Sequence, residues 1–372
     1  MSDFKFFPQH TVWEITFACN MRCLHCGTAA GNKRPKELTD DETYAVVDEL
    51  AALGGRVVTI SGGEPLMRKN WREIARRFLK NGMQAGLISN GYLVTEKIVE
   101  EFKEIGLSNI GISFDGTEKT HNYIRQRPES FRRALNAMKH MTEAKQRYCA
   151  VSQISNINID ELDQIRQILL DVGCPQWRIQ MTTDTGRMSK DFVMPLERYP
   201  EFIDKILTYQ KKNDEIEIDA GENIGYYGCR GMELRDGDPY LGCYAGVFVL
   251  GIESDGTIKG CLSMPEEFVE GNIRDSSLTE IWNNPEGFAY NRKFTRETAS
   301  GACYDCKYLA LCRGGCATTS WSATGERANN PFCIHQIELK QGIQPPPDTQ
   351  MITELLDRFK EPVKEPATAE KD

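Results

Sequence analysis

The chain has 372 residues, of which 40% are hydrophobic and 27% are charged, a composition typical of a soluble globular protein with a barrel-sized domain and a smaller one. Its formal net charge of -9 argues against a nucleic-acid-binding face and against contact with an anionic membrane, since both need clustered Lys and Arg. Residues 1–17 lack the basic and continuous apolar regions of a signal peptide, and no long apolar stretch follows. We therefore expect a cytoplasmic protein.

Short β-rich segments alternate with amphipathic helical patterns through the first part of the chain. The six segments span residues 11–17, 56–61, 84–90, 109–114, 148–154 and 176–181. This alternation predicts parallel βα units. Six units are too few to close an eight-stranded barrel, which leaves an open-sided barrel or an open sheet with its chemistry at the C-terminal strand ends. Asp40 is expected to cap the first helix, and Gly54 with Gly55 to end it.

The sequence becomes rich in Gly and Cys after about residue 225. Residues 247–261 predict a hairpin that turns at Ser254-Asp255-Gly256, and LTEIWNN predicts one short helix. Beyond residue 342 we expect a linker, another short helix and a disordered end. The expected divisions are a lead-in at 1–10, a core at 11–215, a second domain at 216–342 and a tail at 343–372.

Thirteen cysteines are an odd number in a long chain without a secretion signal, which favours metal or redox chemistry over disulfides. Three of them form the motif CNMRCLHC at Cys19, Cys23 and Cys26. Three thiolates in one loop can ligate three irons of a cubane and leave the fourth iron open to an exchangeable ligand. A zinc site is the weaker interpretation, because zinc usually recruits four ligands and His25 is wedged tightly between two of these cysteines.

This motif, placed just after the first strand, resembles that of the radical S-adenosylmethionine (radical SAM) superfamily, and the resemblance spans residues 11 to 340. It implies that Cys19, Cys23 and Cys26 bind a catalytic 4Fe-4S cluster whose open iron chelates the amino and carboxylate groups of S-adenosylmethionine (SAM). His25 matches a position near the adenine. The resemblance also implies reduction of the cluster by a donor such as flavodoxin or ferredoxin.

Further motifs of the family follow in chain order. SGGEP matches the loop that binds the methionyl amino group, through Gly62, Gly63 and Glu64. Glycines allow a close backbone approach, and a carboxylate can pair with an ammonium group. Asn90, in SNG, matches a position near the ribose or the floor of the site, with a surface turn as the alternative.

The fourth-strand segment ISFDGTEKTHNYIRQRPESF resembles the family segment in which a Ser and an Arg hold the ribose or carboxylate. The matching residues are Ser113 and Arg125. Asp115 is expected either to orient the ligand or to cap the following turn. Polar side chains at later strand ends that could face the cavity are Gln153, Gln180 and Thr182.

The second half contains a seven-cysteine pattern that resembles the SPASM extension, which carries two auxiliary 4Fe-4S clusters. By this resemblance the outer cluster is held by Cys303, Cys306, Cys312 and Cys333, and the inner cluster by Cys243, Cys261 and Cys316. Cys229 is the candidate fourth ligand of the inner cluster. The alternatives are that Cys229 only packs in its turn and that one iron is open to substrate. Cys149 and Cys174 are expected to be buried, inert thiols.

The resemblance implies an α/β fold with a partial (β/α)6 radical SAM barrel followed by a small Cys-rich SPASM domain, and three 4Fe-4S clusters in all. It predicts an oxidoreductase that generates a 5'-deoxyadenosyl radical to modify a ribosomally made peptide, by a crosslink, a thioether or epimerisation. Formylglycine formation is disfavoured because Leu262 replaces the Asp of those relatives. The alternative substrate is a tetrapyrrole or another small cofactor. An electron-transfer protein would not need SGGEP.

About ten residues precede the first strand, so we expect no fused leader-binding domain and a separate leader-binding protein as a partner. Nucleic acids and membranes are not expected partners.

Overall fold

The computed structural model describes residues 5–212, 215–345 and 347–358. Its framework is a ten-stranded sheet with the strand order β10-β9-β8-β1-β2-β3-β4-β5-β6-β7. The strands are β1 (His10–Glu14), β2 (Val57–Ser61), β3 (Gln84–Ser89), β4 (Asn109–Ser113), β5 (Tyr148–Ile154), β6 (Gln176–Met181), β7 (Glu217–Ala220), β8 (Val249–Ile252), β9 (Thr257–Lys259) and β10 (Val269–Asn272). All six predicted strands are present, and β1 to β7 pair in parallel.

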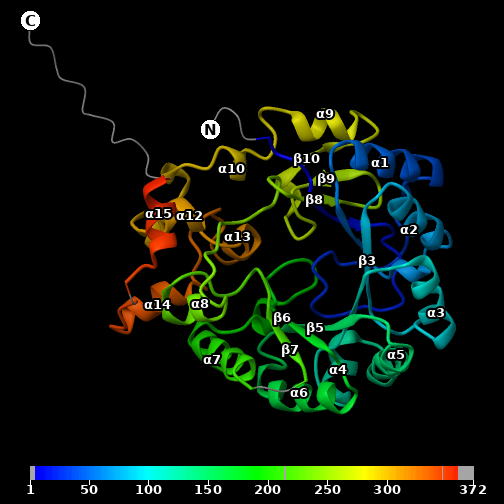
Figure 1. Cartoon of the computed structure of the whole chain (residues 1–372), viewed down its shortest axis with the longest axis horizontal. Helices are drawn as coiled ribbons and strands as arrows, with labels where there is room; N and C mark the ends of the chain where they lie inside the picture. Colours follow the sequence, from blue (N-terminus) through cyan, green and yellow to red (C-terminus); the bar gives the residue numbers. More distant parts are fainter. Residues whose placement is uncertain (1–4, 213–214, 346, 359–372) are drawn as a thin grey trace, which may run out of the picture.

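Helices cover the outside of the curved sheet, as Figure 1 shows for α1 to α7. The α-helices of the first half are α1 (Asp40–Ala52), α2 (Trp71–Lys80), α3 (Glu96–Ile105), α4 (Glu118–Arg125), α5 (Ser130–Ala144), α6 (Leu162–Asp171) and α7 (Tyr199–Gln210). Later α-helices are α8 (Gly228–Glu233), α9 (Leu278–Asn283), α10 (Ala289–Arg292), α11 (Gly301–Tyr304), α12 (Leu309–Cys312), α13 (Ala317–Thr324), α14 (Ile334–Lys340) and α15 (Gln350–Arg358). Short 3-10 turns are η1 (Pro65–Met67), η2 (Ile159–Glu161), η3 (Lys190–Phe192), η4 (Leu196–Arg198), η5 (Glu266–Phe268) and η6 (Arg296–Thr298).

Side chains alternate between the two faces of each strand, as strand geometry requires. Leu87 and Ile112 point toward the helices and are fully buried in the main hydrophobic core. Ile88 and Ser113 point the other way, into the concave face, and remain partly exposed. This arrangement leaves the concave face, rather than the packed helical face, accessible to a ligand.

The first helix begins differently from the prediction. Thr39, not Asp40, is the N-cap: its hydroxyl accepts a hydrogen bond from the Glu42 backbone N–H, and the Glu42 carboxylate accepts one from the Thr39 N–H. This reciprocal capping box satisfies two free backbone donors, and Asp40 is the first residue of the helix itself. Gly54, with a φ of 91°, follows the helix end as predicted.

The second half of the chain is joined to the first through β8, which pairs in parallel with β1. The predicted hairpin is present, because β8 and β9 are antiparallel, and α9 is the predicted short helix. Arg34 adds ion pairs across this junction, to Glu14 at 3.2 Å and to Glu253 at 3.0 Å. None of the helices in the described ranges is long and apolar enough to cross a membrane. The predicted disordered end falls on residues 359–372, outside the described residues.

Candidate active site and auxiliary cluster sites

The CNMRCLHC loop follows β1 and brings its three cysteines together. The Cys26 N–H donates to the Cys23 carbonyl at 3.3 Å, and the Cys19 N–H donates to Gly31 at 2.8 Å. Burial is the main reason that the pKa of Cys19 is raised to about 11, and the charges of Glu64, Cys23 and Cys26 also contribute. The thiols therefore need a cation nearby to become thiolates, and this donor set fits an iron-sulfur cluster.

The ligating groups are spread rather than focused on one point. Within the described ranges, no three His, Cys, Asp or Glu side chains converge tightly enough to share a single metal ion. A cubane does not require such convergence, because each thiolate binds its own iron.

Gly62 and Gly63 allow the loop after β2 to lie directly against the start of the cluster loop. A Cβ at Gly62 would lie 2.6 Å from the Thr16 carbonyl oxygen, and one at Gly63 would lie 2.6 Å from that of Phe17. The Gly63 N–H donates to Thr16 at 2.7 Å. Any larger residue would push the two loops apart, so these glycines fix the position of the cysteines.

The Glu64 side chain is fully buried between β2 and β3. Its carboxylate accepts hydrogen bonds from the Asn90 N–H at 2.8 Å, the Ser89 hydroxyl at 3.0 Å and the Leu66 N–H at 3.3 Å. Burial is the main reason that its pKa is raised to about 7. The Asn90 side chain donates in turn to Asn20 of the cluster loop at 2.7 Å. Glu64 and Asn90 thus support the cluster loop, and their contact with SAM stays a prediction.

Asp115, just after β4, connects two predicted site residues. Its carboxylate contacts His25 Nε2 at 3.0 Å and Arg125 at 2.5 Å. Burial would raise the pKa of Asp115, but the charges of Arg125 and His25 outweigh it and hold that pKa well below its usual range. Arg125 also lies 3.8 Å from the Cys23 sulfur, and its Nε has no hydrogen-bond partner in the described part of the chain. Asp115 therefore orients both His25 and Arg125 beside the cluster loop.

The other predicted residues lie at or just after the C-terminal ends of β4, β5 and β6. Ser113 ends β4 and is partly exposed. The Gln153 side chain donates to Gln180 at 2.6 Å, which joins the ends of β5 and β6. Thr182 is buried, and its hydroxyl has no hydrogen-bond partner among the described residues.

Sequence reasoning missed the loop after β6, which clamps the cluster loop from the opposite side. Arg187 donates from Nε to the Cys23 carbonyl at 2.9 Å and from Nη1 to Ala30 at 2.8 Å. Gly186 has a φ of 60°, and a Cβ there would overlap the Cys26 carbonyl oxygen. The available signal was the TGR sequence at residues 185–187, shortly after the sixth strand, where a glycine and a cation follow a strand end.

The four cysteines assigned to the outer auxiliary cluster line one cavity. Leu309, Tyr226 and Asn330 are also part of its lining, and the thiols belong to Cys303, Cys306, Cys312 and Cys333. Burial, followed by the charges of the other three cysteines, raises the pKa of Cys312 well above its usual value. Four thiols around one cavity, with Cys306 partly exposed and the other three buried, fit a cubane ligated at every iron.

Three of the four cysteines assigned to the inner auxiliary cluster are neighbours. Burial raises the pKa of Cys261 to about 11, with further contributions from Cys243 and Cys316. Cys229 has different surroundings. Its sulfur faces the Gln344 carbonyl at 3.6 Å, and its N–H donates to Glu338 at 2.8 Å. The charges that most affect its thiol come from Glu338, Arg230 and Glu233, not from a cysteine. The geometry thus favours a three-cysteine inner site, and ligation by Cys229 has no support from its contacts.

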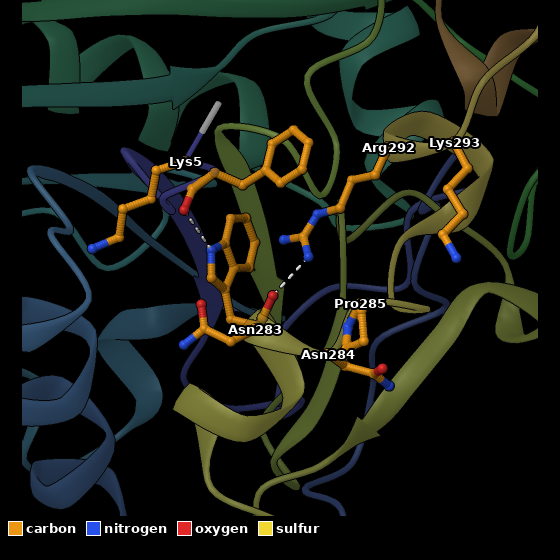
Figure 2. Close-up of a pocket in the computed structure, with 8 residues that line it drawn as sticks. Lys5, Asn283, Asn284, Pro285, Arg292 and Lys293 are labelled. Atoms are coloured by element: carbon orange, nitrogen blue, oxygen red, sulfur yellow. Dashed lines mark hydrogen bonds between the residues drawn. The ribbon is translucent and has the colours of Figure 1, made fainter. Parts of the chain in front are cut away.

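A separate pocket of about 260 Å³ lies between the lead-in segment and α9 and α10 (Figure 2). Arg292 lies over the rings of Phe6, Trp282 and Phe288 and donates to the Trp282 carbonyl at 2.7 Å. The Trp282 indole donates to the Phe6 carbonyl at 3.3 Å. No predicted site residue lines this pocket, and its contacts anchor the start of the chain.

Comparison with known families agrees with this geometry. The radical SAM superfamily model matches residues 13–172, and the SPASM model, an iron-sulfur cluster-binding domain, matches residues 243–307. The chain thus contains a radical SAM domain followed by a SPASM domain. It is accordingly an enzyme that uses SAM and a 4Fe-4S cluster.

Particular relatives fall into two groups. An AdoMet-dependent heme synthase of Methanosarcina barkeri is 29% identical over 88% of this chain and 97% of its own length. The mycofactocin maturase MftC of Mycolicibacterium smegmatis is 26% identical over 83% of this chain and 78% of its own length. The crystal structure of Streptococcus suis SuiB bound to S-adenosylmethionine has a TM-score of 0.67 at 16% identity, covering 88% of this chain and 76% of SuiB. At that identity the likeness to SuiB concerns the fold.

Proposed function

We propose that this enzyme uses radical SAM chemistry to modify a side chain of a tetrapyrrole. The observation that carries this proposal is the match to the heme synthase, which extends over 97% of that relative and 88% of this chain. The match therefore includes both the barrel and the SPASM region. A peptide was the substrate that the sequence favoured, and the tetrapyrrole was its alternative.

The concave face of the barrel supports the proposal. Ile88 is 36% exposed although it lies on a central strand. Gly111, on the next strand, has no side chain, and a Cβ there would lie 3.2 Å from Ile88 and 3.3 Å from Val151. These three residues form a shallow apolar surface inside the barrel, which suits the flat ring of a tetrapyrrole.

The residues that surround this surface have distinct proposed roles. Cys19, Cys23 and Cys26 would hold the catalytic cluster, which supplies the electron that cleaves SAM to methionine and a 5'-deoxyadenosyl radical. Arg125, oriented by Asp115, would bind the SAM carboxylate, and the loop at Gly62 and Gly63 would lie beside the methionyl amino group. Two auxiliary clusters in the SPASM region would bring the total to about twelve irons.

The test is a substrate comparison under anaerobic conditions with reduced, reconstituted enzyme. Fe-coproporphyrin III is offered with SAM, and 5'-deoxyadenosine and the porphyrin mass are followed by liquid chromatography and mass spectrometry. We expect 5'-deoxyadenosine to form together with a SAM-dependent change in porphyrin mass. An enzyme that cleaves SAM but leaves the porphyrin unchanged would contradict the proposal. The control is the variant with Cys19, Cys23 and Cys26 all replaced by Ala.

A ribosomally made peptide is the second candidate, favoured by the 26% identity to the mycofactocin maturase. The same assay with a precursor peptide, alone and with a leader-binding protein, distinguishes the two. Peptide modification without porphyrin turnover would establish this candidate instead.

A further inference from the structure

Tyr290, in α10, has a buried hydroxyl group that forms no hydrogen bond with any described residue. Its ring is held in place by an edge-on contact with Phe268, with ring centroids 5.0 Å apart. Buried polar groups in folded proteins are almost always hydrogen-bonded, because an unpaired one has lost its water without compensation. The partner that the Tyr290 hydroxyl needs is therefore not among the described residues.

The residues around this hydroxyl indicate where its partner would lie. Gly260 precedes the ligand Cys261, and a Cβ at Gly260 would overlap the Tyr290 oxygen. Glycine at this position leaves the room that the phenol occupies. Burial is the main influence that raises the pKa of Tyr290, followed by the charges of Cys243, Glu270 and Cys261. The phenol thus lies beside two of the three thiols of the inner site.

We propose that Tyr290 donates a hydrogen bond to a sulfide of the inner auxiliary cluster held by Cys243, Cys261 and Cys316. This inference rests on the proposed cluster ligation. A hydrogen bond to a cluster sulfur stabilises the more negative, reduced form and raises the reduction potential. Tyr290 is a positioning residue that tunes this one cluster, and no part of the reaction passes through its ring.

The test is Tyr290→Phe, which removes the hydroxyl and keeps the ring. It is made in the variant lacking Cys19, Cys23 and Cys26, so that only the auxiliary clusters contribute signals. Redox titration followed by electron paramagnetic resonance should show one auxiliary cluster about tenfold harder to reduce, a shift of about 59 mV to more negative potential. The other auxiliary cluster should be unchanged. Electron-nuclear double resonance should lose one exchangeable proton coupled to the shifted cluster.

Tyr148→Phe is the matched control, because its hydroxyl already bonds to Thr142 at 2.8 Å on the barrel. It should leave both potentials unchanged. The proposal would be overturned if Tyr290→Phe keeps its full iron content and shows unchanged reduction potentials and an unchanged proton coupling. A parent variant that binds no auxiliary iron would instead refute the cluster ligation itself. If Tyr290→Phe alone loses iron, 3-fluorotyrosine is placed at position 290 instead, because its hydroxyl is a stronger hydrogen-bond donor. The reduction potential of the inner cluster should then shift to a more positive value. An unchanged potential would overturn the proposal.

Discussion

The barrel and the region around residues 299–333 hold their cysteines in different ways. The catalytic loop is fixed by contacts that need no metal, through the backbone at Gly63, the Asp115 carboxylate and the Arg187 guanidinium. Residues 299–333 instead contain short helices, such as the four-residue α11 and α12. Their small hydrophobic clusters include the cysteines themselves. The proposed catalytic cluster would therefore bind to a preformed loop, whereas the proposed outer auxiliary cluster would complete a core.

The largest expected effect follows from removing the outer cluster. Replacing Cys306 and Cys312 together with Ala leaves two ligands, too few to hold a cubane. Because metal binding and folding are coupled where the core is small, residues 299–333 should lose their protection from hydrogen exchange. The barrel helices α1 to α6 should keep theirs. Hydrogen-exchange mass spectrometry of the anaerobic protein measures both regions in one sample.

The matched variant replaces Cys19, Cys23 and Cys26 with Ala. It should lose about four irons and all SAM cleavage, while hydrogen exchange stays at the parental level in both regions. Two outcomes would contradict the distinction between the two regions. One is unfolding of the barrel in this triple variant. The other is full protection of residues 299–333 from hydrogen exchange in the Cys306, Cys312 double variant.

A smaller effect is expected at the Asp115–Arg125 pair. Arg125→Ala leaves the fully buried Asp115 carboxylate without its arginine partner, which should lower the free energy of unfolding by about 3–5 kcal/mol. The double variant Asp115→Asn, Arg125→Met should lose less, because no unpaired charge remains. Arg125→Lys should keep the fold but weaken SAM binding about tenfold, as calorimetry would show. Equal unfolding free energies for Arg125→Ala and the double variant would contradict the pairing.

Glu64 should make the barrel less stable as the pH rises, whereas a salt-bridged acid makes a protein more stable as the pH rises. Its pKa is raised by burial from 4.5 to about 7, so the folded state holds a proton that the unfolded state releases above pH 4.5. Stability should therefore fall by about 3 kcal/mol as the pH rises from 4.5 to 7, and then level off. Thermal unfolding of the wild type and Glu64→Gln across this range measures the difference. Parallel curves for the two proteins would contradict a buried, raised-pKa carboxyl.

The structure could be predicted from the sequence where a motif or a hydrophobic periodicity determines it. All six βα strands and the β8–β9 hairpin could be predicted, because strand alternation and turn residues are local signals. Prediction failed where a contact joins distant segments. Arg187 lies 164 residues beyond Cys23, to whose carbonyl it donates, and the TGR segment does not indicate which distant loop it contacts. The grouping of the cysteines in the second half was implied by the resemblance to the SPASM extension rather than by a local signal, and Cys229 has other neighbours than the group it was assigned to.

The smallest expected effect concerns Cys229, which tests the boundary of the inner site. Its sulfur lies on α8 against Gln344, and its backbone is held by Glu338 of α14. A thiol with these neighbours contributes packing rather than metal ligation, so Cys229→Ala should leave the iron content, the auxiliary-cluster spectra and turnover at wild-type levels. Cys316→Ala is the positive control and should change the spectrum of the inner cluster. If Cys229→Ala changes that spectrum as well, a fourth protein ligand closes the inner cluster, and direct binding of substrate to an open iron is excluded.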